Sequence, residues 1–161
     1  MSEHLVKRFW LFCMVVISSA AMVWPMAYRP ASPNDELAPG SPQLIQASEL
    51  AQKMKSAQKP VILYVGPKSF YAQSHISGAE YIGPAAKPEG LEKLRARAAS
   101  LPKDAEVVIY CGCCPWDHCP NIHPAYAELK KAGFTKARVL YLATSFGVDW
   151  KDKGLPVATG E

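Results

Sequence analysis

The residues best suited to chemistry are four cysteines that fall within nine positions, at 111, 113, 114 and 119. They follow the apolar run Val107–Tyr110, which has the length and the β-branched composition of a buried strand. An open α/β sheet places its reactive groups just beyond the carboxyl ends of its strands, and Cys111 occupies that position. A thiol there can act as a nucleophile, a redox group or a soft-metal ligand.

The local sequence favours Cys111 as the catalytic nucleophile. Gly112 lets the backbone approach closely, and a helix is predicted to begin near Pro124, with Pro124 at its first position and His123 as its cap. Successive backbone amides and a helix N-terminus can hold an anionic sulfur. We therefore expect the pKa of Cys111 to be lowered and its thiolate to be the reacting group.

The rest of the loop is predicted to bind substrate through Gly112, Cys113, Cys114, Trp116 and His118. For Trp116 we favour a role in anchoring the loop onto the domain over a role as pocket wall. His118 is the other titratable base within the loop. Cys114 and Cys119 are candidate resolving thiols, each able to form a disulfide with Cys111.

Two alternative functions remain open from the residues alone. Cys111 to Cys114 form a Cys-x-x-Cys, which is also typical of thiol–disulfide redox proteins. Alternatively, the four thiols with His118 and His123 could bind Cu(I) or zinc. Adjacent cysteines fit one tetrahedral site poorly, so the leading hypothesis includes no metal ligand and no cofactor.

The N-terminus has the layout of an export signal or membrane anchor, assigned to residues 1–27. Lys7 and Arg8 precede a stretch without charge, Phe9–Tyr28, which includes small residues at 18–20. We expect a periplasmic or otherwise extracytoplasmic protein, free or membrane-anchored. The N-terminal segment would then engage the membrane or the export machinery.

Residues 28–42 are predicted to form a proline-rich linker, and residues 43–161 to form one domain. The whole chain of 161 residues carries a formal net charge of only +4, with its basic residues scattered. This pattern argues against a nucleic-acid partner.

Strand-length apolar runs alternate with helical patterns in the predicted domain. The strands are expected at 44–46, 61–65, 79–82, 107–110 and 138–142, and the helices at 49–55 (with Ser48 as cap), 91–98 and 125–132 (ended by Gly133). This alternation predicts an α/β fold with a parallel sheet covered on both faces.

Four segments in this order resemble motifs of rhodanese domains. They are the His-Ile-x-Gly-Ala stretch within Ser74–Ile82, the strand and cysteine of Val107–Cys111, the Leu-x-x-x-Gly-Phe of Leu129–Phe134, and the closing Phe146–Trp150 with Gly154–Val157. The resemblance covers 43–159. It implies a single rhodanese-like domain with a five-stranded parallel sheet and helices on both faces, and sulfurtransferase chemistry through a persulfide on Cys111.

The sequence departs from the family pattern in two places. The family's Asp-x-Arg at the end of the second strand is replaced by Tyr64-Val65-Gly66, and the loop after Cys111 is several residues longer than usual. This loop contains no arginine that could clamp a phosphate or a doubly charged donor. We therefore expect a neutral small-molecule donor or a protein-bound one, with a thiol as acceptor.

Overall fold

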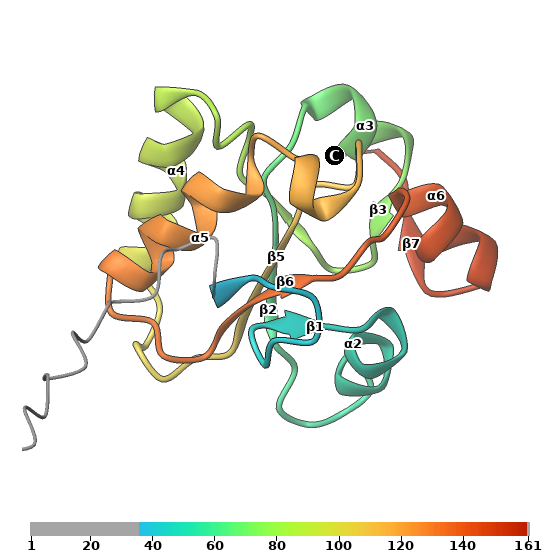
Figure 1. Cartoon of the computed structure of the whole chain (residues 1–161), viewed down its shortest axis with the longest axis horizontal. Coiled ribbons are helices and arrows are strands. Elements are labelled where there is room, and N and C mark those ends of the chain that lie inside the picture. Colours follow the sequence, from blue (N-terminus) through green and yellow to red (C-terminus); the bar gives the residue numbers. More distant parts are fainter. Residues whose placement is uncertain (1–35, 161) are drawn as a thin grey trace, which may run out of the picture. The chain divides into compact units, whose positions relative to one another are not determined.

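The computed structural model describes residues 36–160 (Figure 1). The predicted export signal or anchor at 1–27 and the first part of the predicted linker lie outside the described residues. Among the helices that the structure describes, none is long and apolar enough to cross a membrane.

The predicted five-stranded parallel sheet is confirmed. Its strands, in spatial order, are β1 (Leu44–Ile45), β6 (Ala137–Leu140), β5 (Val107–Tyr110), β2 (Val61–Tyr64) and β4 (Glu80–Tyr81). Every neighbouring pair is parallel. β5 is therefore the central strand, and the residue that follows it emerges at the middle of the sheet's carboxyl edge.

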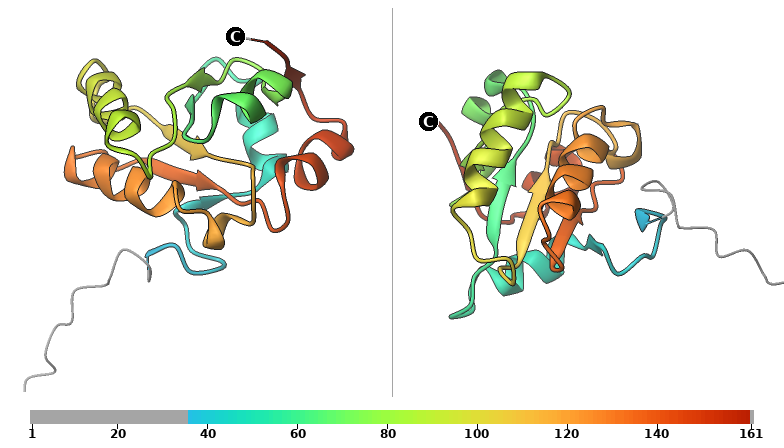
Figure 2. Two further views of the ribbon diagram at one scale, coloured as in Figure 1. Left: turned by 90° about the horizontal axis from the view of Figure 1, so that it is seen from above. Right: turned by 90° about the vertical axis from the view of Figure 1, so that its left-hand side faces the viewer.

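Helices cover both faces of this sheet, as predicted (Figure 2). They are α2 (Ala47–Lys53), α3 (Lys68–Gln73), α4 (Pro88–Ala99), α5 (Ile122–Lys131) and α6 (Phe146–Asp149), with 3₁₀ turns at Trp116–His118 and Lys151–Lys153. Side chains alternate along each strand, so Leu63 packs with α4 and α5, whereas Ile62 packs with α2, α3 and α6. Two apolar layers result, one on each face.

Two predicted helix starts are wrong. α2 begins at Ala47 after Gln46, so Ser48 is not its cap. α5 begins at Ile122 after Asn121, which makes Pro124 the third helical residue and leaves His123 inside the helix. The backbone N–H groups of a helix's first turn have no partner within the helix, so proline is tolerated anywhere in that turn. Pro124 was therefore compatible with more than one helix start.

Gly133 ends α5 as predicted. Its φ of +88° lies in the left-handed region, which side chains disfavour. Its N–H donates to the Lys130 carbonyl at 2.9 Å, and the Phe134 N–H donates to the Leu129 carbonyl at 3.1 Å. These bonds satisfy the last carbonyls of the helix.

A second, antiparallel ribbon was not predicted. It pairs β3 (His75–Ile76) with β7 (Val157–Ala158). Two residues are too few for a strand to show a hydrophobic period. The buried Trp150 supports the ribbon, since its indole N–H donates to the Pro156 carbonyl at 2.9 Å.

A cluster of tyrosines supports the end of β2, where the family pattern has Asp-x-Arg. The ring centre of Tyr64 lies 5.3 Å from that of Tyr71 and 5.1 Å from that of Tyr110. The Tyr71 hydroxyl donates to the Ala79 carbonyl at 2.6 Å, and the Tyr110 hydroxyl accepts the Ile76 N–H at 2.9 Å. Aromatic packing and hydroxyl hydrogen bonds therefore support this end of β2.

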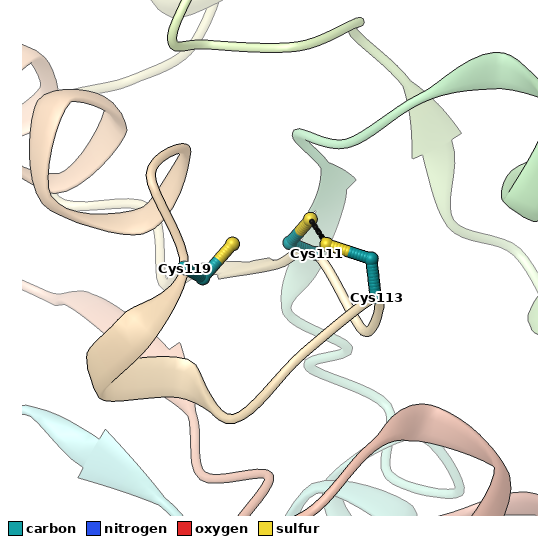
Figure 3. A group of neighbouring side chains, drawn as sticks. All are labelled: Cys111, Cys113 and Cys119. Atoms are coloured by element: carbon teal, nitrogen blue, oxygen red, sulfur yellow. Dashed lines mark hydrogen bonds between the residues drawn. The ribbon is translucent and has the colours of Figure 1, made fainter.

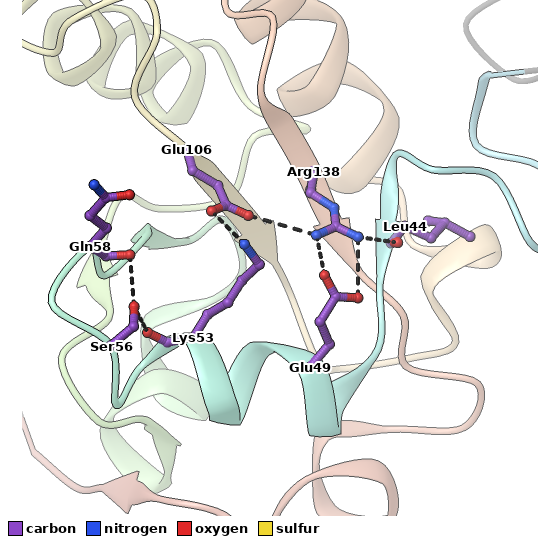
Figure 4. Close-up of polar contacts among 7 residues, drawn as sticks. All are labelled: Leu44, Glu49, Lys53, Ser56, Gln58, Glu106 and Arg138. Atoms are coloured by element: carbon purple, nitrogen blue, oxygen red, sulfur yellow. Dashed lines mark hydrogen bonds and ion pairs between the residues drawn. The ribbon is translucent and has the colours of Figure 1, made fainter.

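An ionic network lies near the start of β5 and β6 (Figure 4). Both Arg138 terminal nitrogens donate to the Glu49 carboxylate, and Nη2 also donates to the Leu44 carbonyl at 3.1 Å. Glu106 lies 3.7 Å from Arg138 and accepts from Lys53 at 3.0 Å. The edge strand β1 and helix α2 are thus joined to β6 on the side away from the cysteines.

The last part of the predicted linker packs on the domain. Leu37 is only 1 % exposed and belongs to the core layer beneath α4 and α5. Glu36 accepts a hydrogen bond from the Tyr126 hydroxyl at 3.1 Å. Proline spacing alone does not reveal one buried leucine, so this contact could not be predicted from the sequence.

We predict that Leu37→Ala lowers the free energy of unfolding by about 2–5 kcal/mol, because a buried leucine leaves a cavity when truncated. Urea denaturation of the full chain measures this. Val148→Ala is the control, because Val148 is 49 % exposed and its truncation should cost less than about 0.5 kcal/mol. Equal effects of the two variants would show that Leu37 is not part of the core.

Candidate functional site

Cys111 follows β5 directly, at the place that the sequence predicts. The Val65 N–H donates to the Tyr110 carbonyl at 2.9 Å, which keeps β2 and β5 paired up to this point. Cys111 is 2 % exposed. The central strand therefore presents a nearly buried sulfur at the carboxyl edge of the sheet.

Two glycines make room for this arrangement. A Cβ on Gly66 would lie 2.6 Å from the Cys111 sulfur and 2.7 Å from the Tyr64 hydroxyl oxygen. Gly112 has a φ of +83°, and a Cβ there would lie 2.7 Å from that of Phe146. Because the Phe146 N–H donates to the Gly112 carbonyl at 3.1 Å, the turn and α6 are held together. The glycine that replaces the family's arginine thus leaves space beside the sulfur.

The four cysteines form one cluster of free thiols. The Cys111 and Cys113 sulfurs lie 3.2 Å apart, and those of Cys113 and Cys114 lie 3.3 Å apart. The sulfurs of Cys111, Cys113 and Cys119 all lie within 4.8 Å of one another (Figure 3). The loop therefore turns back so that Cys119 faces the strand end.

Asn121 is a site residue that sequence reasoning missed. It is 4 % exposed, and its Oδ1 accepts the Ala86 N–H at 2.9 Å. This bond orients its amide nitrogen toward the Cys111 sulfur at 3.5 Å and the Cys119 sulfur at 3.9 Å. The position of this polar residue just before α5 could have identified it from the sequence, but His123 was predicted as the helix cap instead.

Of these two buried thiols, Cys119 is the one whose ionisation the surroundings favour, as the directions of the two pKa shifts indicate. Interaction with the neighbouring Cys111 thiol lowers the pKa of Cys119 to about 5 despite its burial. The Asn121 backbone and side-chain N–H groups contribute to the same lowering. Interaction with Cys119, together with burial, raises the pKa of Cys111. The expected lowering of the Cys111 pKa is therefore wrong for the free protein, because a neighbouring thiol competes for the negative charge.

The remaining loop residues take different positions. Trp116 is 7 % exposed, and its backbone N–H donates to the Leu142 carbonyl at 3.1 Å, so it anchors the loop as favoured from the sequence. His118 has a side chain 79 % exposed, with Nδ1 2.8 Å from an Asp117 oxygen. Burial raises the pKa of Cys114 to about 12.

A pocket of about 270 Å³ opens beside the strand end. Cys111, Gly112 and Cys113 line it together with the aromatic rings of Tyr64, Phe70 and Phe146. Among the residues that line it, Lys151 is the only one with a charged side chain, and it was not identified from the sequence. Cys114, Trp116, His118 and Cys119 do not line this pocket, so Cys111 and Cys113 are the thiols that a bound molecule would meet.

The chain is thus a parallel α/β domain with a thiol at the carboxyl end of its central strand. Comparison with protein families identifies the family to which this domain belongs. The model of the rhodanese-like domain family matches residues 46–148. The chain belongs to the rhodanese-like domain family. Such domains are commonly sulfurtransferases, although many members are not catalytically active.

Solved structures support the same fold. The solution structure of a rhodanese-like domain from Anabaena sp. is 26 % identical with a TM-score of 0.52, covering 73 % of this chain and 79 % of that one. A crystal structure of the Anabaena protein is 25 % identical with a TM-score of 0.54, covering 72 % and 92 %. A full-length protein from Lactobacillus plantarum is 24 % identical with a TM-score of 0.52, covering 73 % and 88 %, and shows the fold alone. A search of curated proteins found no match.

We predict that one thiolate forms with a midpoint near pH 5, because the pKa of Cys119 is lowered to about 5. Thiolate absorbance in the ultraviolet should therefore rise as the pH increases through that value. Cys119→Ser should remove this transition. Asn121→Leu should move it upward by roughly 1–2 pH units, because a hydrogen bond to a charged group is lost.

The matched variant for this titration is Cys111→Ala. It deletes the neighbouring thiol that lowers the pKa of Cys119 and should also raise the midpoint. A transition that persists in Cys119→Ser and disappears in Cys111→Ala would instead place the thiolate on Cys111.

Proposed function

We propose that this protein is an exported sulfurtransferase that carries a sulfane sulfur as a persulfide on Cys111. The observation that supports this most strongly is the position of Cys111, at the end of the central strand and in the wall of the pocket. Membership of the rhodanese-like family supports the same reaction class.

In this proposal Cys119 accepts the proton of Cys111, since the two sulfurs lie within 4.8 Å of each other. The Cys111 thiolate then attacks the outer sulfur of the donor. A new sulfur–sulfur bond forms on Cys111, and the donor leaves with the electron pair of its broken bond. The Asn121 amide, 3.5 Å from the Cys111 sulfur, is placed to donate to the developing anion.

The pocket favours a donor with little negative charge. Lys151 is the single cation among its lining residues, and the other lining residues are uncharged, three of them aromatic. A thiosulfate dianion would lack the bidentate arginine contact that doubly charged groups favour. We therefore propose a neutral or singly charged persulfide donor, small or protein-bound, and a thiol acceptor.

Release of the sulfur by an internal thiol is a second candidate step. Attack by the Cys119 thiolate on the inner sulfur of the persulfide would form a Cys111–Cys119 disulfide and expel hydrosulfide. The proximity of the sulfurs, all within 4.8 Å, favours this route. An external dithiol would then reduce the disulfide and become oxidised itself. Cys114 is the alternative resolving thiol, through its 3.3 Å contact with Cys113.

We predict that Cys111→Ser abolishes sulfur transfer, because a hydroxyl cannot form a persulfide. Intact mass spectrometry after treatment with a small persulfide should show a gain of about 32 Da on the unaltered chain and none on the variant. The free energy of unfolding should change by less than about 1 kcal/mol, since the replacement differs by one atom.

Cys113→Ser and Cys114→Ser are the matched controls and should reduce turnover less. If a resolving thiol is required, its loss should trap the added sulfur on Cys111. Full transfer by Cys111→Ser, with the adduct mapped to Cys119, would move the nucleophile to the far end of the loop.

Export is the second part of the proposal and is supported by the basic pair and the uncharged stretch that follows it in the sequence. At native expression, the chain should fractionate with the membrane or the extracytoplasmic space. Replacing Leu11 and Val15 with aspartate should retain it in the cytosol, because charges in the apolar segment prevent insertion. Recovery of the unaltered chain in the soluble cytosol would contradict export.

A further inference from the structure

The sulfurs of Cys111, Cys113 and Cys119 form a set of soft donors that is assembled without a ligand (Figure 3). All three lie within 4.8 Å of one another, and two of them are 2 % exposed. Neither a carboxylate nor an imidazole belongs to this group among the described residues. Sulfur-only donor sets select soft ions.

We propose that these three cysteines bind one Cu(I) ion in a three-coordinate site. A thiol that is still protonated releases its proton to solvent when it binds, and no electron transfer is involved. Copper binding requires three sulfurs, whereas a persulfide requires only one. The two proposals can therefore be tested separately.

The distances fit such an ion. A metal about 2.3 Å from three sulfurs in one plane places them about 4 Å apart. The Cys111 and Cys113 sulfurs lie 3.2 Å apart, and no pair in the group exceeds 4.8 Å. Side-chain rotations that move each sulfur by less than about 1 Å would therefore bring the three sulfurs to these distances.

The surroundings fit as well. The Asn121 amide donates toward the Cys111 and Cys119 sulfurs, and the Ala86 N–H holds that amide in place. Hydrogen bonds of this kind orient metal-binding sulfurs and reduce their charge. Trp116 is buried in the same core layer as Cys111 and Cys119, so this side of the cluster is apolar.

Zinc fits less well because it prefers four ligands in a tetrahedron. Cys114 is the only other described cysteine, and the three-sulfur group does not include it. Its sulfur lies 3.3 Å from that of Cys113, its neighbour in sequence. His118 is bonded to Asp117 and exposed, so it does not supply a fourth ligand.

Bound copper and bound sulfur exclude each other, because both use the Cys111 sulfur. A copper-loaded chain should not gain the persulfide mass. A chain that already carries the persulfide should bind Cu(I) more weakly.

The test is a competition titration of the full-length reduced chain with Cu(I) and a coloured Cu(I) chelator, without oxygen. We expect one ion per chain, and X-ray absorption should show about three sulfurs near 2.3 Å. Cys113→Ser and Cys119→Ser should each lower Cu(I) affinity by roughly 100-fold or more. Loss of a direct ligand should cost at least as much affinity as loss of an outer-shell partner. Cys114→Ser is the matched control and should keep the affinity.

Circular dichroism of each variant confirms that the fold is retained before its affinity is compared. Unchanged affinity in Cys113→Ser or Cys119→Ser would overturn the site. Loss of affinity in Cys114→Ser, with zinc bound through four sulfurs, would overturn both the ion and the ligand set. Because Cys113→Ser retains the Cys111 sulfur, its persulfide mass reports on sulfur transfer independently of copper.

Discussion

The arrangement of the site depends on one buried amide, that of Asn121. Its oxygen accepts from Ala86 in the connection between β4 and α4, and its nitrogen faces the sulfurs of Cys111 and Cys119. An uncompensated amide in this environment would cost about 1–3 kcal/mol, so the three segments are constrained together. The residue before α5 therefore fixes the distance between a strand end and the far side of a long loop.

This constraint also decides where the negative charge lies. A single thiolate at the end of a strand would be stabilised by loop amides and by a helix N-terminus. Here a second sulfur lies beside the first and shares the Asn121 amide, and this arrangement lowers the pKa of Cys119 and raises that of Cys111. The nucleophile and its proton acceptor are thus two residues of the same type, distinguished by access to the pocket.

The sequence predicted the central features of the fold because they produce local patterns of apolar residues. The apolar run Val107–Tyr110 marked the central strand, and Cys111 was located from it. Asn121 and Leu37 were missed because each acts as a single side chain whose partners are distant in sequence. The pKa of Cys111 was misjudged for a related reason, since the proximity of Cys119 follows from the path of the loop and not from spacing.

The loop is covered by residues that follow it in the chain. The Leu142 carbonyl accepts the Trp116 N–H, and Phe146 packs against Gly112. During synthesis or translocation from the N-terminus, the thiols emerge before these partners do. An oxidant would then meet four unprotected cysteines, whose adjacent sulfurs can pair wrongly. Because of this order, the reducing or oxidising character of the compartment influences which sulfurs remain free when the domain has folded.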